Sequence, residues 1–182
     1  AWRYAIFNTV SIATTTGYAS TDYNQWPIFA PVLMLFLCCF ATSAGSTGGG
    51  IKMIRALILM KQALREFTRI LHPRVINPVQ LGGQAIENNV IFAVLAFMLI
   101  YGGSIIFFTM LLLFSGLDVI TAFTAVIASI NNTGPGLNQV GPATNYAGLT
   151  DVETWICTFA MLIGRLELLA VLVLFTPAFW RK

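Results

Sequence analysis

Two short polar runs in this sequence could bind a metal ion through main-chain oxygens. Residues 14–18 read Thr-Thr-Thr-Gly-Tyr, and residues 131–136 read Asn-Asn-Thr-Gly-Pro-Gly. Each run follows an apolar segment too short to cross a bilayer and precedes one that is long enough. A hydroxyl- or amide-rich run that ends in glycine can turn its carbonyls toward one axis, where they replace the water around a monovalent cation. The two runs therefore predict an ion pore.

The last residues of each run are the candidate ligands. Glycine at Gly17 and Gly134 permits the positive φ that aligns successive carbonyls on one side of the chain. We expect the oxygens to come from the residues before each glycine, namely Thr15, Thr16, Asn132 and Thr133. The competing interpretation is that both runs are ordinary polar turns outside a membrane, and the short apolar helices before them argue against it.

The composition is that of an integral membrane protein. Of 182 residues, 57% are hydrophobic and 9% are charged, with a mean hydropathy of +0.79, so a soluble domain could not maintain a polar surface. The net charge of +3 does not indicate nucleic-acid binding, because six basic residues cluster between Lys52 and Arg74. Such a cluster between apolar spans is typical of the cytoplasmic side of a membrane.

The titratable residues give no sign of an enzyme. Catalysis would need paired carboxylates, a His/Asp set or a serine beside a base, and the acidic residues here are scattered. Cys38, Cys39 and Cys157 lie inside apolar runs, where we expect neither a disulfide nor a metal site. The single histidine, His72, stands alone in the basic segment.

Hydropathy and turn residues predict the order of the elements. We expect a short re-entrant helix at residues 2–13, a first span at 28–41 and a glycine-rich break at 42–50. A basic helix at 51–70 and a linker at 72–86 should follow. After them we expect a long span at 89–114, a second short helix at 119–130 that is capped by Asp118, and a last span at 152–175. We also expect at least one further membrane span before residue 1. Both glycine-bearing turns then open toward the outside.

An internal repeat relates the two halves. With an offset of 117, Thr16-Gly17 falls on Thr133-Gly134. The offset describes a unit of outer helix, short pore helix, filter turn and inner helix, complete in residues 87–182 and lacking its first helix in residues 1–71.

The sequence resembles the C-terminal part of bacterial Trk-type potassium uptake subunits, in the Trk/Ktr/HKT superfamily. The resemblance covers the whole chain and rests on the two polar runs, on Ser-Ala-Gly-Ser-Thr-Gly-Gly-Gly-Ile-Lys at residues 43–52, and on the isolated Arg165. It implies an all-α integral membrane fold in which four such units surround one pore with pseudo-fourfold symmetry. Residues 1–71 and 87–182 would be the third and fourth units.

The resemblance also implies a function and partners. It implies K⁺ uptake across a bacterial inner membrane by a multi-pass protein, with K⁺ as the transported ion. It further implies a homodimer and a cytoplasmic nucleotide-binding regulatory ring of the TrkA type that contacts the linker and the C-terminus. Each turn carries one filter glycine, and Pro135 departs from Tyr18 in the other copy, so we expect moderate selectivity, with Rb⁺ following K⁺.

Two features could gate the pore. Arg165 lies within the last apolar span, and a cation at the bilayer centre costs at least about 2.5 kcal/mol. The family implies that it sits below the filter; the alternative is an ion pair with Glu167 or a neighbouring helix. The second candidate is the break at residues 42–50, which includes Gly45, Ser46, Thr47, Gly48, Gly49 and Gly50. The alternative there is a kink that lets helices pack closely.

A cation-coupled secondary transporter, moving Na⁺ or H⁺ with K⁺, is the alternative function. Such carriers often break full-length spans near the midplane. The short helices expected here favour the pore instead.

Overall fold

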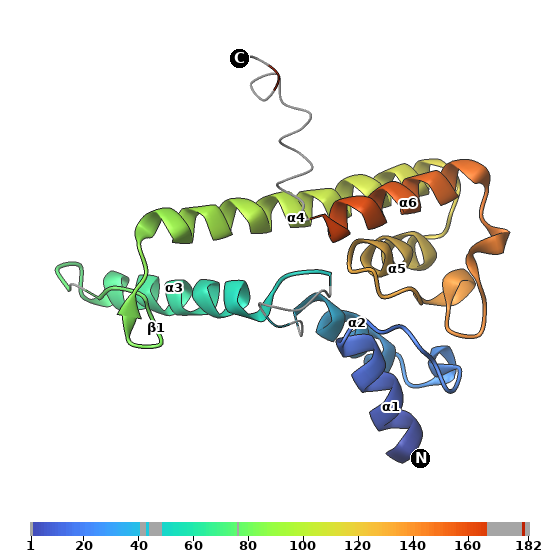
Figure 1. The fold of residues 1–182 in the computed structure, drawn as a ribbon, viewed down its shortest axis with the longest axis horizontal. Helices are drawn as coiled ribbons and strands as arrows, with labels where there is room; N and C mark the ends of the chain where they lie inside the picture. Colours follow the sequence, from blue (N-terminus) through green and yellow to red (C-terminus); the bar gives the residue numbers. More distant parts are fainter. Residues whose placement is uncertain (1, 41–42, 44–48, 76, 167–179, 181–182) are drawn as a thin grey trace.

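The computed structural model describes residues 2–40, 43, 49–75, 77–166 and 180, and helices account for most of them (Figure 1). The helices are α1 Trp2–Ala13, α2 Phe29–Phe40, α3 Met53–Leu71, α4 Asn88–Phe114, α5 Val119–Ile130 and α6 Asp151–Arg165. Short 3₁₀ turns occur at η1 Tyr23–Gln25, η2 Asn138–Val140 and η3 Tyr146–Gly148. A two-stranded antiparallel hairpin, β1 Gln80–Leu81 with β2 Gln84–Ala85, lies in the linker.

The predicted helices match the structure closely. The expected bounds of α1 and α5 are confirmed, and α4 begins one residue earlier than predicted. The hairpin was not predicted, so an all-α description fits the helical segments and not the linker. Most of the expected break, residues 42 and 44–48, and the expected end of the last span, residues 167–175, lie outside the described residues.

Among the described residues, α4 is long and apolar enough to cross a membrane. Its 27 residues extend about 40 Å at 1.5 Å per residue, and none of them is charged. Helices α2 and α5 are apolar but shorter, with 12 residues each. A 12-residue helix covers about 18 Å, so neither crosses a 30 Å hydrocarbon core alone.

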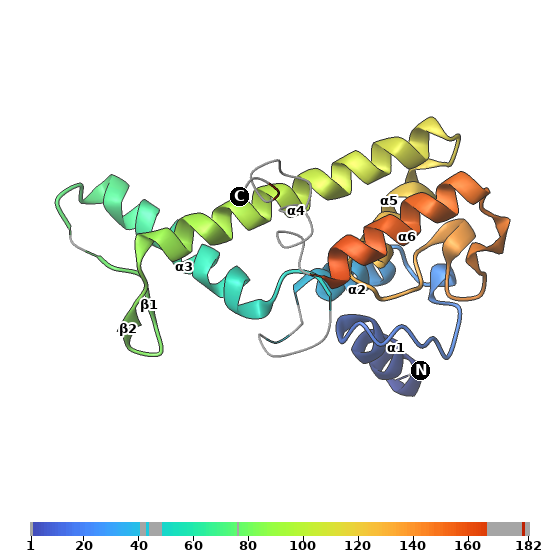
Figure 2. The same ribbon diagram turned by 45° about the horizontal axis from the view of Figure 1, so that its top comes forward.

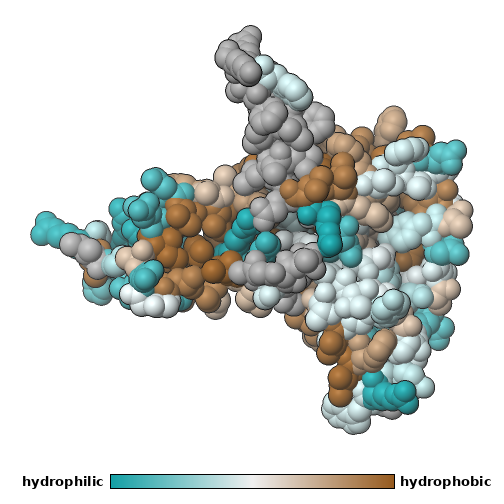
Figure 3. Space-filling view, viewed as in Figure 1, coloured by the Kyte–Doolittle hydropathy of each residue, from teal (hydrophilic) through white to brown (hydrophobic). Residues whose placement is uncertain are grey.

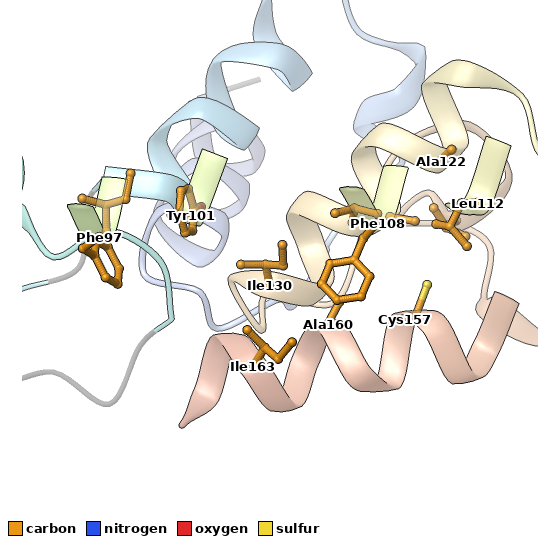
Figure 4. Packing of buried hydrophobic residues seen from close by; sticks show 13 residues of the cluster. Phe97, Tyr101, Phe108, Leu112, Ala122, Ile130, Cys157, Ala160 and Ile163 are labelled. Atoms are coloured by element: carbon orange, nitrogen blue, oxygen red, sulfur yellow. The ribbon is translucent and has the colours of Figure 1, made fainter. Parts of the chain in front are cut away.

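Helix α5 is the centre of the packed core. Nine of its 12 residues are buried, because it lies against α4 on one side and α6 on the other. Figure 4 shows Ile130 of α5 beside Ile163 and Ala160 of α6, and Leu112 of α4 farther along the same cluster, near Ala122 and Cys157. Both views show α3 running alongside the N-terminal half of α4, with the linker joining their ends (Figures 1 and 2).

Polar caps fix where α5 and α6 begin. As predicted, Asp118 caps α5: its carboxylate accepts a hydrogen bond of 3.0 Å from the Thr121 amide. Helix α6 begins with a capping box, which the sequence analysis missed although the Thr-x-x-Glu pattern is its usual signature. The Thr150 hydroxyl accepts from the Glu153 amide, and the Glu153 carboxylate accepts from the Thr150 amide.

Helix α6 crosses the end of α5 at a glycine. A Cβ on Gly164 would overlap the carbonyl oxygen of Ile130, whereas Gly103, in α4, has open space where a Cβ would go. The crossing distance between α5 and α6 therefore depends on the missing side chain at Gly164.

We predict that Gly164→Ala lowers the stability of the protein by about 1–3 kcal/mol, because the helices must separate to accept the methyl group. The control Gly103→Ala adds the same methyl group in open space and should leave stability unchanged or raise it by up to about 1 kcal/mol. Thermal unfolding in detergent measures both. Equal melting temperatures for the two variants would contradict the crossing contact.

Candidate ion-binding site

The two polar turns have the same backbone hydrogen bonds. In the first, the amides of three residues donate to carbonyls of α1: Thr14 to Val10 at 2.9 Å, Thr15 to Ile12 at 3.0 Å, and Thr16 to Ser11 at 2.8 Å. In the second, the donors and acceptors are Asn131 to Ile127 at 3.0 Å, Asn132 to Ser129 at 3.0 Å, and Thr133 to Ala128 at 2.9 Å. Adding 117 to each number in the first set gives the second. The bounds of α1 and α5 differ by the same offset, from 2–13 to 119–130.

Both turns are left-handed at equivalent positions. Gly17 has φ +82° and Gly134 has φ +104°, as the sequence predicted. Thr15 and Asn132 also have positive φ, 56° and 53°, which was not predicted. Asparagine tolerates this region, but a β-branched threonine rarely occupies it. Such backbone conformations persist only where the surrounding structure enforces them, and they cluster at functional sites.

The two turns lie directly against each other. A Cβ on Gly17 would overlap the carbonyl oxygen of Thr133 and would come within 3.4 Å of Pro135 Cδ. The structure therefore brings together the two glycine-bearing runs that the sequence predicted to share a site, although they are more than a hundred residues apart.

Several side chains of the turns are engaged in structural contacts. The Thr16 hydroxyl lies 2.9 Å from that of Thr14, and the Asn132 amide nitrogen donates to the Met161 carbonyl at 3.2 Å. The Thr133 side chain is buried, with 4% of its surface exposed, but its hydroxyl has no hydrogen-bond partner within the described part of the chain. The Gly134 carbonyl accepts a hydrogen bond of 2.8 Å from the Tyr146 hydroxyl. These contacts hold the turns in shape and make main-chain oxygens the better candidates for ion ligands.

Asn131 connects the second turn to three other elements, a role that sequence analysis missed. Its side chain is fully buried; Oδ1 accepts from the Tyr101 hydroxyl of α4 at 3.0 Å, and Nδ2 donates to Ile127 O at 2.9 Å and to Cys39 Sγ of α2 at 3.4 Å. A single tyrosine hydroxyl within the apolar run of α4 was the signal available. A buried hydroxyl there needs a partner inside the protein.

The described end of the predicted break also contacts Asn131. A Cβ on Gly49 would overlap the Asn131 carbonyl oxygen, and a Cβ on Gly50 would overlap its side-chain Oδ1. The Ile51 amide then donates to the Cys39 carbonyl at 2.8 Å, which returns the chain to the end of α2. Of the gate residues predicted in this segment, Gly45, Ser46, Thr47 and Gly48 lie outside the described residues.

Arg165 lies close to the second turn. It is exposed at the end of α6. Together with Asn132 and Trp155, it lines a concave surface pocket with a volume of about 390 Å³. Its neighbour Gly164 contacts Ile130, the last residue of α5, so the end of α6 lies beside the start of the second turn. Glu167, the alternative partner considered from the sequence, lies outside the described residues.

A carboxylate anchors the chain that follows the second turn. Asp118 accepts hydrogen bonds from Asn138 Nδ2 at 3.1 Å and Gln139 Nε2 at 3.4 Å, in addition to capping α5. Hydrogen bonding, chiefly with Thr121, keeps the pKa of Asp118 below its ordinary value. The carboxylate is therefore ionised in neutral solution and ties the start of α5 to η2.

Comparison with known proteins finds clear relatives. The family model TrkH, described as a cation transport protein, matches residues 1–182. The potassium uptake protein TrkH of Vibrio parahaemolyticus is 42% identical over the whole chain, and that of Escherichia coli K12 is 42% identical over 98% of it. The E. coli protein TrkG is 36% identical over 98% of the chain. The chain spans 37%, 36% and 36% of these relatives, respectively.

A solved structure supports the fold. The crystal structure of the potassium transporter TrkH from V. parahaemolyticus matches with a TM-score of 0.90 and 43% identity, over 98% of this chain and 38% of that one.

We predict that Tyr101→Phe lowers stability by about 1–3 kcal/mol, because it leaves a buried Asn131 oxygen without its donor from α4. The control Tyr4→Phe removes a hydroxyl from a side chain that is 48% exposed and should change stability by less than about 0.5 kcal/mol. Thermal unfolding in detergent compares them. A Tyr101→Phe melting temperature equal to that of the control would show that the contact with Asn131 is not needed.

Proposed function

The chain belongs to the TrkH family of cation transport proteins, and we propose that it forms part of a pore for K⁺ uptake across a membrane. Its relatives are named Trk system potassium uptake proteins. Because the chain spans about 37% of their length, the proposal concerns its contribution to a larger pore. The relatives are transporters by name, which supports transport rather than catalysis.

The two abutting turns carry this proposal. We assign the K⁺ ligands to main-chain oxygens of Thr15, Thr16, Asn132 and Thr133, aligned by the turns at Gly17 and Gly134. The shared hydrogen bonds and left-handed φ values support equivalent roles for the two turns. Rings of backbone carbonyls can replace the hydration shell of K⁺, because their dipoles are held at fixed positions.

Two turns supply only part of a coordination shell. In the proposed pore, residues 1–71 and 87–182 are the third and fourth of four units around a pseudo-fourfold axis, and the rest of a longer protein supplies the other two turns. The side chains of Thr16 and Asn132 have structural partners, which leaves the carbonyls as the repeated feature of both turns.

We assign the gate to Arg165 and to the segment that contains Gly45–Gly50. The concave surface shared by Arg165 and Asn132 supports a position for the guanidinium close to the filter. A positive charge there raises the barrier to a cation. The contacts of Gly49 and Gly50 with Asn131 support a direct link between this segment and the second turn.

The wider assembly is proposed on family membership. The protein is a multi-pass component of a bacterial inner membrane, surrounded by lipid, and it pairs as a homodimer. A cytoplasmic nucleotide-binding ring would contact the linker at residues 72–86. A secondary transporter that couples K⁺ to Na⁺ or H⁺ is less favoured, because α1 and α5 are short helices that end in equivalent turns rather than broken full-length spans.

We predict that Gly17→Ala reduces K⁺ or Rb⁺ uptake at least tenfold, because a Cβ at Gly17 would push the Thr133 carbonyl out of place. The control Gly82→Ala introduces a comparable backbone strain, because Gly82 also has a left-handed φ, +58°. Gly82 lies in the linker hairpin and has open space around it. Uptake of Rb⁺ into proteoliposomes measures both. Equal uptake by the two variants would contradict a filter at the contact between the turns.

We also predict that Arg165→Ala increases K⁺ flux several-fold, because it removes the charge that opposes cation entry. Arg165→Lys keeps the charge and should stay close to the wild-type flux. The matched control Arg3→Ala removes an exposed charge at the start of α1 and should have no effect. The gate assignment fails if Arg165→Ala and Arg3→Ala conduct alike.

A further inference from the structure

A basic pocket lies at the end of the molecule opposite the two turns. It has a volume of about 500 Å³ and is formed by the end of α3, the linker after it and the start of α4. Its charged lining residues are Arg65, Arg69, Arg74 and Glu87. Three guanidinium groups against one carboxylate give the lining a net charge of +2, and the Glu66 carboxylate lies beside the pocket, 3.9 Å from Arg69 Nη1. The proposed ion pathway uses none of these residues.

The pocket has the donor groups of an anion site. Arg65 is held in place by bonds from Nη1 to Asn88 Oδ1 at 3.2 Å and to Gln62 Oε1 at 3.4 Å, which use one nitrogen of a group with five N–H donors. Asn88 is also the first residue of α4, whose N-cap Glu87 makes no side-chain capping bond. The N-terminus of a long helix favours an anion, because its first amides have no acceptor within the helix.

The position of the pocket along α4 points to the membrane surface. Arg65 contacts the first residue of α4, the helix that is long enough to span a bilayer. Because α4 is about 40 Å long and a hydrocarbon core is about 30 Å thick, each end of a centred α4 extends roughly 5 Å beyond the core. Arg69 is one turn farther along α3, about 6 Å away along the axis. The headgroup region adds roughly 5–8 Å on each side of the hydrocarbon core, so Arg65 lies within this region and Arg69 at its outer edge.

Exposed apolar side chains flank the pocket on the membrane side. Phe92 of α4 is 69% exposed, and Val90 is also exposed. On α3, Leu64 and Met60 precede Arg65 and are 56% and 65% exposed. Figure 3 shows hydrophobic surface over this helix pair, next to hydrophilic residues at its outer end. A ligand with a phosphate at one end and hydrocarbon at the other matches this arrangement, whereas a free phosphate would use only the polar half.

We propose that this pocket binds the phosphate of an anionic phospholipid, with the acyl chains along α3 and α4. Arginine recognises phosphate through its planar fork of donors, and basic pockets between helices on the cytoplasmic side bind acidic lipid head groups. The lipid would hold the basic end of α3 against the start of α4. The site depends on insertion in a membrane and does not depend on the assignment of the ion ligands.

The test compares the lipid dependence of thermal stability in two variants. Arg69→Gln/Arg74→Gln removes two charges from the pocket, and Arg3→Gln/Arg181→Gln removes two charges near the ends of the sequence. The protein in detergent is titrated with phosphatidylglycerol, with phosphatidylcholine and with inorganic phosphate. The melting temperature is measured at each lipid concentration, so the result does not depend on ion flux.

Phosphatidylglycerol should raise the melting temperature of the wild type and of the control, and phosphatidylcholine should not. The pocket variant should need roughly 30-fold more phosphatidylglycerol, because each basic residue near an anionic surface contributes roughly 1 kcal/mol. An unchanged response of the pocket variant would overturn the proposal. So would an equal effect of phosphatidylcholine, which would indicate a nonspecific lipid effect, or of inorganic phosphate, which would assign the pocket to a free anion.

Discussion

The contact between Gly17 and the Thr133 carbonyl sets the geometry of this protein. Two left-handed turns can meet this closely only where one of them has no side chain, and a glycine with positive φ meets both requirements. The helices before the turns, α1 and α5, have 12 residues each and end directly at the turns. The fold places these ends beside each other, and every proposal about the ion path depends on that placement.

A buried polar network holds the second turn in this position. Tyr101 from α4 and Cys39 from α2 both bond to the Asn131 side chain, and Gly49 and Gly50 pack against the same residue. Such a network is costly if any member loses its partner, so it favours a single arrangement of the turn. Under the proposed assignments, it also connects the proposed gate segment to the proposed filter, because Gly49 and Gly50 contact Asn131 directly. Arg165 approaches the same turn from α6, through the close crossing at Gly164.

Much of this arrangement was predictable from the sequence. The bounds of α1 and α5, the cap at Asp118, the left-handed glycines and the family were all predicted, because they depend on local patterns: apolar runs, a capping residue, and glycine after threonine. The positive φ of Thr15 was not predictable, because threonine disfavours that region and only tertiary contacts enforce it. The role of Asn131 was missed for a similar reason. Its partners, Tyr101 and Cys39, come from helices whose relative positions no local pattern specifies. The linker hairpin was missed because its strands have two residues each, too few for a periodic pattern.

The proposed ion site between the two turns is tested most directly by locating a heavy alkali-metal analogue in a crystal or cryo-EM structure of the protein. Rb⁺ or Tl⁺ should give strong density within coordination distance of the main-chain oxygens of Thr15, Thr16, Asn132 and Thr133, on an axis between the two turns. Density found only elsewhere, with the two turns facing away from any conduit, would show that these main-chain oxygens do not bind the transported ion.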